Sequence, residues 1–246
     1  NMRKPQLADV RVRTAISEAV DWQRILSTAY HGYGVLAVSD IFPQSWAAPA
    51  LPPYRYDPAD ARRLLAAAGW TMGSDGVLHK GDLAMRLSIS TTANQAESEH
   101  AELVLQAMLR PFGIELDIHN YPANVLFAQS GPIYGGRYDL EWSVETNGAD
   151  PDDSGSWNSR FIPPNGANTS WLRDPIVDET SDDAASTFDE RTRKALYQRE
   201  AARLRQLNPA IFVYWERAYV AMNSDVRNYR PAAFIADEWN AWQWEI

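Results

Sequence analysis

Several acidic side chains lie close together in residues 141–153. An acid/base pair of the kind that glycoside hydrolysis requires could lie among Glu141, Glu145, Asp150, Asp152 and Asp153, although Glu141 is on the strand face opposite Trp142. Asp150 and Asp152 also faintly resemble a calcium loop, but Phe161 stands where the bidentate Glu of such a loop is needed. Acidic surface groups are common in a chain of net charge −9, so the catalytic interpretation is weak and the segment is first of all a candidate binding loop.

Other catalytic chemistry has no support in the sequence. The chain has no cysteine, no G-x-S-x-G motif and no glycine-rich phosphate loop. We therefore expect no metal and no cofactor. The histidines lack metal-ligand spacing; they are His31, His79, His100 and His119.

Large aromatic side chains near the acidic segment are candidates for ligand contact. Trp157 and Trp171 lie in loop-like sequence, and Trp46 lies in the proline-rich segment after Pro43. Each of these side chains either packs over a ligand or fills a local core. Trp142 belongs to the alternating pattern of a predicted strand, which favours a place in the core over a role as a platform for a ligand. Asn168 could bond a ligand or only form a loop turn.

Three alternating segments predict the strands that would position these residues. Residues 83–89 and 114–118 read as strands, separated by a helix from about residue 97, and residues 138–144 read as a third. This order predicts a mainly parallel sheet with a right-handed crossover. In such sheets ligands bind beyond the carboxyl ends of the strands, which is where residues 145–152 would lie.

The second half of the chain is expected to be mostly loop and helix. Residues 145–173 are rich in Asn, Gly, Pro, Asp and Ser, and a loop of this length is usually functional or mobile. Helices are predicted from about Asp174 and Asp189, and residues 211–215 read as a buried strand. The tail 226–246 is aromatic but weakly periodic.

Composition limits the possible functions. With 246 residues, 45% of them hydrophobic and ten of them tryptophan, the chain is large enough for a substantial core. Its basic residues are scattered, which argues against nucleic-acid binding. No apolar run is long enough to span a bilayer. The absence of cysteine suits an exported protein without disulfides, and many cytosolic proteins equally.

Residues 56–70 encode a helix together with both of its ends. Asp57 is placed to accept hydrogen bonds from first-turn N–H groups, and Pro58 suits the first helical position. Gly69 can adopt the left-handed stop conformation, with Trp70 packing back on the helix. The expected buried face consists of Ala61, Leu64, Leu65 and Ala68.

Two further helices are predicted in residues 7–29. Asp9 is placed to cap the first of them, and Asp21 to cap the second. The apolar face of the first would consist of Val12, Ala15, Ile16, Ala19 and Val20, and that of the second of Trp22, Ile25, Leu26 and Ala29.

The segments 56–70 and 7–21 together resemble the solute-binding proteins of oligopeptide- and dipeptide-type ABC importers, extracellular solute-binding protein family 5. The resemblance covers essentially the whole chain and implies an α/β fold: a class II periplasmic-binding-protein lobe, with a mainly parallel sheet flanked by helices. It also implies that residues 1–225 are the C-terminal lobe of a longer protein and that residues 226–246 return to a first lobe absent from this sequence. Further similar segments are 31–34, 42–43, 111–117, 138–139, 174–178 and 191–207.

Asn147 is where the sequence departs from the family. In peptide-binding members an Asp at the matching position pairs with the α-ammonium group of the peptide, and counting back from Pro151 places Asn147 there. An amide cannot neutralise a buried ammonium. Either Glu145 or Asp150 substitutes, or the ligand lacks a free amine and a sugar is plausible. Alternatively, Asn147 only forms a turn with Gly148.

The resemblance implies extracytoplasmic capture of a peptide or sugar for an ABC importer, without enzymatic activity. The implied partners are the permease subunits and the missing first lobe, and the implied location is the periplasm or the cell exterior, with lipoprotein anchoring as an option. The expected ligand contacts are Trp46, Trp142, Glu145, Asn147, Asp150, Trp157, Asn168 and Trp171.

Two other classes of function remain as alternatives. A carbohydrate-active hydrolase would use the carboxylates of residues 145–153, and loss of turnover on changing Glu145 or Asp150 to the amide would identify it. A docking module for partner proteins would instead present a broad exposed apolar patch around the C-terminal tryptophans.

Overall fold

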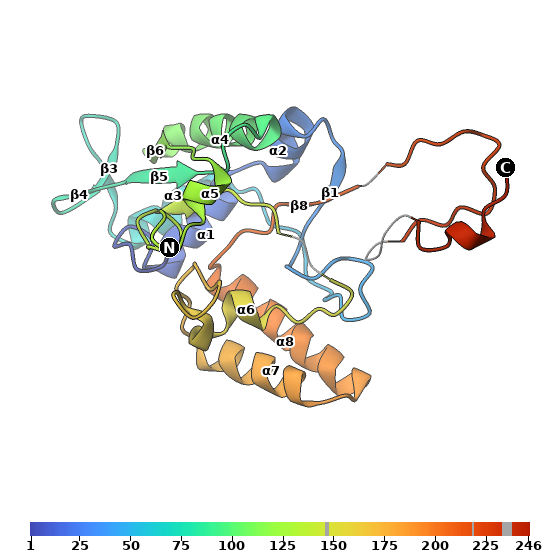
Figure 1. Ribbon diagram of the computed structural model, residues 1–246. Helices are drawn as coiled ribbons and strands as arrows, with labels where there is room; N and C mark the ends of the chain where they lie inside the picture. The colour runs from blue at the N-terminus through green and yellow to red at the C-terminus, as the bar shows by residue number, and fades with distance from the viewer. Residues whose placement is uncertain (146–147, 218, 233–237) are drawn as a thin grey trace.

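A three-stranded parallel sheet forms the centre of the α/β part of the molecule (Figure 1). The structure is a computed structural model, and it describes residues 1–145, 148–217, 219–232 and 238–246. Strand β5 (Arg86–Ser90) lies between β6 (Glu115–Ile118) and β7 (Leu140–Glu141) and pairs in parallel with both. Helix α4 (Ala96–Leu109) connects β5 to β6, so the predicted strand–helix–strand unit is confirmed. The alternation arises because Leu87 and Leu116 are buried in the core.

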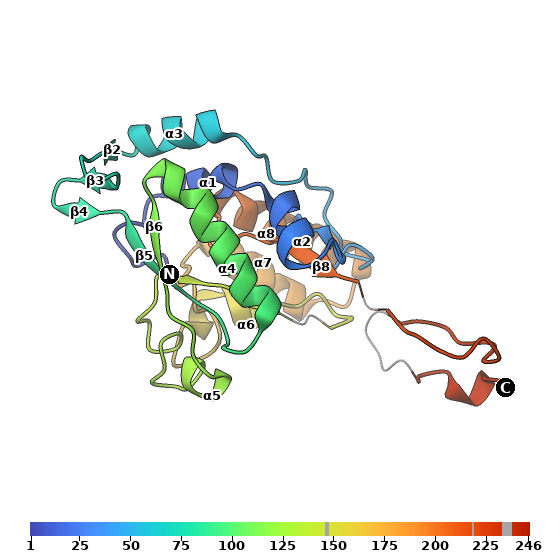
Figure 2. The same cartoon turned by 90° about the horizontal axis from the view of Figure 1, so that it is seen from above.

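Helices cover this sheet in two packed pairs. Helix α4 packs beside α2 (Trp22–Ala29), and α1 (Val10–Ala19) packs beside α3 (Pro58–Ala67); Figure 2 shows both pairs from above. Each of α1, α2 and α3 begins at the predicted aspartate, whose carboxylate accepts a hydrogen bond from a first-turn backbone N–H.

Short elements complete this part of the chain. A 3-10 turn, η1 (Arg110–Phe112), follows α4, and Gly113 adopts φ 73° before β6 begins, a conformation that glycine reaches without steric cost. A small antiparallel sheet comprises β2 (Thr71–Met72), β3 (Leu78–Lys80) and β4 (Leu83–Ala84), and α5 (Ala123–Leu126) follows β6.

A helical layer lies below the sheet in the view of Figure 1. Helices α7 (Pro175–Ser186) and α8 (Glu190–Leu207) pack against each other, and the short α6 (Ser154–Trp157) packs on α7. Helices α7 and α8 begin where the sequence predicts, and Asp174 and Asp189 cap them. At 18 residues, α8 is the longest helix in the described part of the chain; neither it nor any other described helix is apolar and long enough to cross a bilayer.

Two strand predictions were too long. The expected strand over 138–144 is reduced to β7, because β5 ends at Ser90 and offers no further partner; Val144 is 67% exposed. The expected buried strand over 211–215 is β8 (Tyr214–Glu216), which pairs only with β1 (Gly34–Leu36). Because that sheet has two strands, the side chains of Tyr214 and Trp215 are only half-buried.

The loop-like segment 145–173 is interrupted by short helical turns. This segment contains α6 and a 3-10 turn, η2 (Ser159–Phe161). Asn158 caps η2 and also donates to the Ser181 hydroxyl on α7. Its side-chain hydrogen bonds therefore tie the polar segment to the helical layer.

In the C-terminal segment 226–246, the described residues 226–232 and 238–246 extend away from the rest of the molecule (Figures 1 and 2). A bridge between Arg227 and Glu245 closes it, and it carries the turn η3 (Ala241–Gln243). Its tryptophans contact residues of the same segment: Trp239 packs edge-on against Trp242, and Trp244 against Tyr229. Trp242 nevertheless remains 74% exposed. The boundary at residue 226 and the partner-docking alternative stay predictions.

Candidate functional site

Two carboxylates from distant parts of the sequence meet at one tryptophan. Trp157, at the end of α6, donates its indole N–H to Oδ2 of Asp40 at 2.7 Å and to Oδ2 of Asp153 at 3.1 Å. Asp40 follows β1, and Asp153 directly precedes α6. Burial of Trp157 against Phe212, with ring centroids 5.8 Å apart, fixes the position of the shared donor.

Glu200 on α8 is the third carboxylate of this group, and we call Asp40, Asp153 and Glu200 the acidic cluster. Burial, followed by the charges of Asp40 and Asp153, raises the pKa of Glu200 to about 9. Burial also raises the pKa values of Asp40 and Asp153, and the charge of Asp153 raises that of Asp40 further. Like charges held this closely favour proton uptake or a bound cation.

Further carboxylates extend the negative charge from the acidic cluster toward β7. Glu145 is exposed, and partial desolvation together with the charge of Asp153 raises its pKa. At the end of β7, burial and the charge of Glu145 raise the pKa of Glu141 to about 7. The loop at the carboxyl end of β7 therefore carries negative charge, in the place where ligands bind parallel sheets.

Trp142 lies in the main hydrophobic core. Its indole N–H donates to the Tyr30 hydroxyl at 2.8 Å, and the two rings are stacked with centroids 6.5 Å apart. It is buried, in keeping with the core interpretation of its position.

Asp150 and Trp46 meet on α8. Arg193 donates to both carboxylate oxygens of Asp150, at 2.9 and 3.0 Å, and to the Tyr197 hydroxyl at 2.7 Å. Trp46 packs edge-on against Tyr197, with centroids 6.1 Å apart. The charge of Asp150 is thus already paired with a cation, whereas Trp46 is half-buried in the core of the helical layer.

Asn168 holds together the backbone that carries Trp157. It is fully buried, and its amide donates to the carbonyls of Trp157, Asn158 and Leu172. Trp171 is half-buried, with the Arg3 guanidinium 3.2 Å from its ring centroid. Both lie outside the acidic cluster. Asn147 lies outside the described residues.

Sequence reasoning found Asp153 and Trp157 but missed Asp40 and Glu200. Glu200 did offer a detectable pattern, because it lies on the buried face of α8 together with Tyr197, Ala201 and Leu204. A carboxylate in an apolar helical stripe is unusual. Asp40 offered no comparable pattern, since it lies in irregular chain 117 residues from Trp157.

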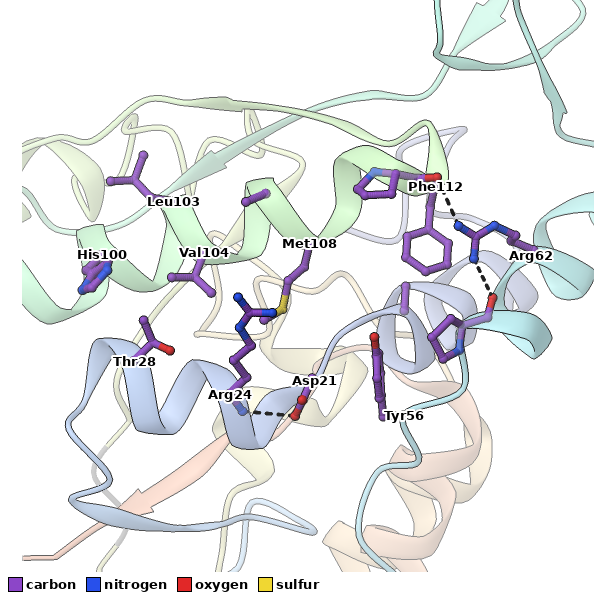
Figure 3. A pocket seen from close by; sticks show the side chains of 14 residues that line it. Asp21, Arg24, Thr28, Tyr56, Arg62, His100, Leu103, Val104, Met108 and Phe112 are labelled. Atoms are coloured by element: carbon purple, nitrogen blue, oxygen red, sulfur yellow. Dashed lines mark hydrogen bonds between the residues drawn. The ribbon is translucent and has the colours of Figure 1, made fainter.

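A separate hollow of about 600 Å³ lies between α2 and α4. Figure 3 shows Arg24 and Thr28 on one wall and His100, Val104 and Met108 on the other. None of the loop carboxylates lines it. Over the described residues, no group of three or more His, Cys, Asp or Glu side chains is placed to hold a metal ion.

Comparison with known proteins agrees with the fold. Oligopeptide-binding protein AppA of Bacillus subtilis is 26% identical over 239 residues, covering 94% of this chain and 43% of AppA. The nickel-binding periplasmic protein of Escherichia coli is 27% identical over 230 residues, covering 90% and 42%. The solved AppA–nonapeptide complex has a TM-score of 0.85 at 25% identity, covering 99% of this chain and 49% of that one.

The chain thus spans less than half the length of these relatives. The structural likeness confirms the expected α/β lobe of solute-binding proteins. The model of the bacterial extracellular solute-binding proteins, family 5 Middle, matches residues 1–168. The chain therefore belongs to family 5 of the bacterial extracellular solute-binding proteins.

Proposed function

We propose that this chain is one lobe of a protein that captures peptides outside the cytoplasm and delivers them to an ABC permease. The observation that carries the proposal is the family match over residues 1–168. AppA is named for oligopeptides and was solved with a nonapeptide, and another relative is named for nickel. These names favour a peptide over the sugar that the sequence left open.

The mechanism we propose is closure of two lobes around the ligand. A ligand shifts an open–closed equilibrium only through contacts that the closed state makes better. Because this chain spans under half of its relatives' length, we infer that a second lobe supplies the remaining contacts. We place the whole protein in the periplasm or at the cell exterior, with a lipoprotein anchor as one option.

On this lobe, we propose that ligand contacts come from the loop after β7. Glu145 is exposed there and lies within electrostatic reach of Asp153. We propose that Glu145 supplies the negative charge that Asn147 lacks, because Asp150 is already paired with Arg193. Trp157, held by Asn168 and the acidic cluster, would form the apolar floor beside it.

Calorimetry with peptide and oligosaccharide panels tests this proposal. We expect the full-length protein to bind peptides, and this chain alone to bind them much more weakly, because one lobe makes only part of the contacts. Binding by this chain alone with a dissociation constant on the order of 1 μM or tighter would contradict the two-lobe mechanism. Binding of oligosaccharides in place of peptides would contradict the ligand class.

We do not propose a hydrolase. A glycosidase needs two carboxylates that flank the scissile bond, one of them free to accept or donate a proton. Asp150 is engaged by Arg193, and the relatives reported above are named as binding proteins.

A further inference from the structure

We propose that the hollow between α2 and α4 is the surface on which the ABC permease docks, through an extracytoplasmic segment that carries acidic side chains next to apolar ones. This inference rests on the proposed function, which is delivery to a permease. It adds the surface of this lobe that takes part and the chemistry of the segment that fits it. None of the residues expected to contact the ligand lines this hollow.

The hollow is separate from the proposed ligand loop. Figure 1 shows α2 and α4 on one side of the sheet, and α7 and α8 on the other. None of the lining residues comes from the loop after β7. When two lobes close around a ligand, that loop becomes enclosed, so a permease must recognise the loaded protein on another surface. The hollow between α2 and α4 meets this requirement.

The charge balance of the hollow is opposite to that of the chain. The described residues that line it include Arg24, Arg62 and His100, and one acidic residue, Asp21. The Asp21 carboxylate accepts a hydrogen bond from the backbone N–H of Arg24 and so serves as the cap of α2. The chain as a whole has a net charge of −9. A positive patch on such a chain selects an acidic partner segment, whereas two copies of the chain repel each other through their net charges.

The two arginines have no carboxylate partner of their own. Arg24 and Arg62 form no ion pair within the described part of the chain, whereas Arg63, the next residue along α3, pairs with Asp60. Both guanidinium groups therefore keep their charge available to an approaching anion. A guanidinium presents five N–H donors in a plane that matches the two oxygens of a carboxylate. In a protein partner, Asp and Glu side chains are the groups that fit it.

Contacts with neighbouring residues hold Arg62 at the edge of the hollow. Its guanidinium lies 4.2 Å from the ring centroid of Phe112 and donates to the carbonyls of Pro58 at 3.1 Å and Pro111 at 3.4 Å. Because these contacts restrict the side chain, less conformational entropy is lost when a carboxylate binds its remaining N–H groups. Figure 3 shows Arg24 on α2, at a different point of the hollow. The hollow thus offers two separate charges to one partner segment.

Apolar side chains supply the rest of the surface. Leu103, on α4, is 56% exposed, and Tyr56, before α3, is 55% exposed. Val104 and Met108 are half-buried and line the same hollow. A partner that covers these side chains gains free energy by removing them from water. A small apolar centre with charges around it suits a transient complex, and delivery requires one because the emptied protein must leave the permease.

Biolayer interferometry tests this inference, with the full-length protein and its permease reconstituted in lipid nanodiscs. Arg24→Glu and Arg62→Glu should each weaken docking about tenfold, mainly by slowing association, because each replaces an attraction with a repulsion. Leu103→Ala should weaken docking about threefold without changing its dependence on salt. All of these side chains are exposed, so the variants should fold as the unmodified protein does, and circular dichroism checks this.

Arg191→Glu is the matched control, because it makes the same change of charge at an exposed position of α8, on the other side of the sheet. It should leave docking unchanged. Docking of both arginine variants at the strength of the unmodified protein would overturn this inference, while peptide binding in calorimetry would still support the proposed function. Failure of the unmodified protein to bind its permease would overturn the proposed delivery and the inference with it.

Other occupants of the hollow would give different results. A dimer of the full-length protein in analytical ultracentrifugation that Arg24→Glu abolishes would assign the hollow to a second copy of the chain, and would overturn the permease as its occupant. Equally strong binding to nanodiscs that lack the permease, lost in both arginine variants, would assign the hollow to the lipid surface and would overturn the inference as well.

Discussion

Glu200 shows how one residue can work against the stability of its own helix. Its neighbours on the buried face of α8, Tyr197, Ala201 and Leu204, pack into the helical layer. A carboxylate in that face must lose water on folding, and it meets the charges of Asp40 and Asp153 there. Folding therefore favours its protonated form.

We expect the stability of the chain to fall as pH rises, partly through Glu200. Its pKa is raised from 4.5 to about 9, so the folded state retains a proton that the unfolded chain releases. The contribution is fully present below about pH 4.5 and is lost progressively toward pH 9. Glu200→Gln should flatten this dependence and raise the free energy of unfolding at pH 8 by roughly 1–3 kcal/mol.

Urea unfolding at several pH values measures both effects. The control is Glu179→Gln, an exposed position on α7, which should keep the pH dependence of the unmodified chain. An unchanged slope in Glu200→Gln between pH 5 and pH 8 would contradict the burial argument.

At the scale of elements, helix α3 is the clearest case of a local sequence that encodes its own boundaries. Asp57 accepts from the Asp60 N–H at its start. At its end, the N–H of Gly69 donates to the Ala66 carbonyl at 2.9 Å, and that of Trp70 to the Leu65 carbonyl at 3.0 Å. This is the Schellman arrangement, which requires a left-handed residue at the glycine position.

Replacing Gly69 with alanine should destabilise the chain through backbone strain. Gly69 has φ +89°, whereas an added Cβ would meet only the flexible Lys80 side chain, no closer than 3.4 Å. We expect a loss of about 1–2 kcal/mol in the free energy of unfolding. Gly155→Ala is the control, since its Cβ would meet nothing within 4 Å and its φ is not positive. Chemical denaturation followed by circular dichroism measures both free energies of unfolding. An equal loss of stability in the two variants would contradict the explanation by backbone strain at residue 69.

At the scale of the whole molecule, the α/β part and the helical layer form the body, and the described residues of the segment 226–246 extend from it (Figure 1). Hydrogen bonds within this segment join the Trp239 indole to the Arg230 carbonyl and the Trp244 indole to Asn240. Its exposed aromatic side chains are suited to packing on another surface, which we propose is the first lobe of the full-length protein.

Deleting residues 226–246 from this chain should therefore change little. We expect the free energy of unfolding to stay within about 0.5 kcal/mol of the intact chain, as for changes away from a packed core. Circular dichroism is the suitable probe, because the deletion also removes three tryptophans, Trp239, Trp242 and Trp244. A loss of several kcal/mol would mean that the segment packs on the body of this lobe.

The sequence by itself determined helices α1, α2 and α3 with their aspartate caps, and the parallel arrangement of β5 and β6. Caps and periodic apolar faces act over a few residues, so Asp57, Gly69 and the buried face of α2 could be read directly. The lengths of β7 and β8 could not be read in this way, because a strand extends only as far as its partner does.

The candidate site, too, was only partly predictable from the sequence. Residues 145–153 were predicted as a binding loop because their composition and their place after a strand are local properties. Only the tertiary structure decided that Asp40 joins Asp153 at Trp157, that the charges of both raise the pKa of Glu200, and that Arg193 takes up the charge of Asp150. The physical reason is that charges interact through space at distances of a few ångströms, which no spacing along the chain encodes.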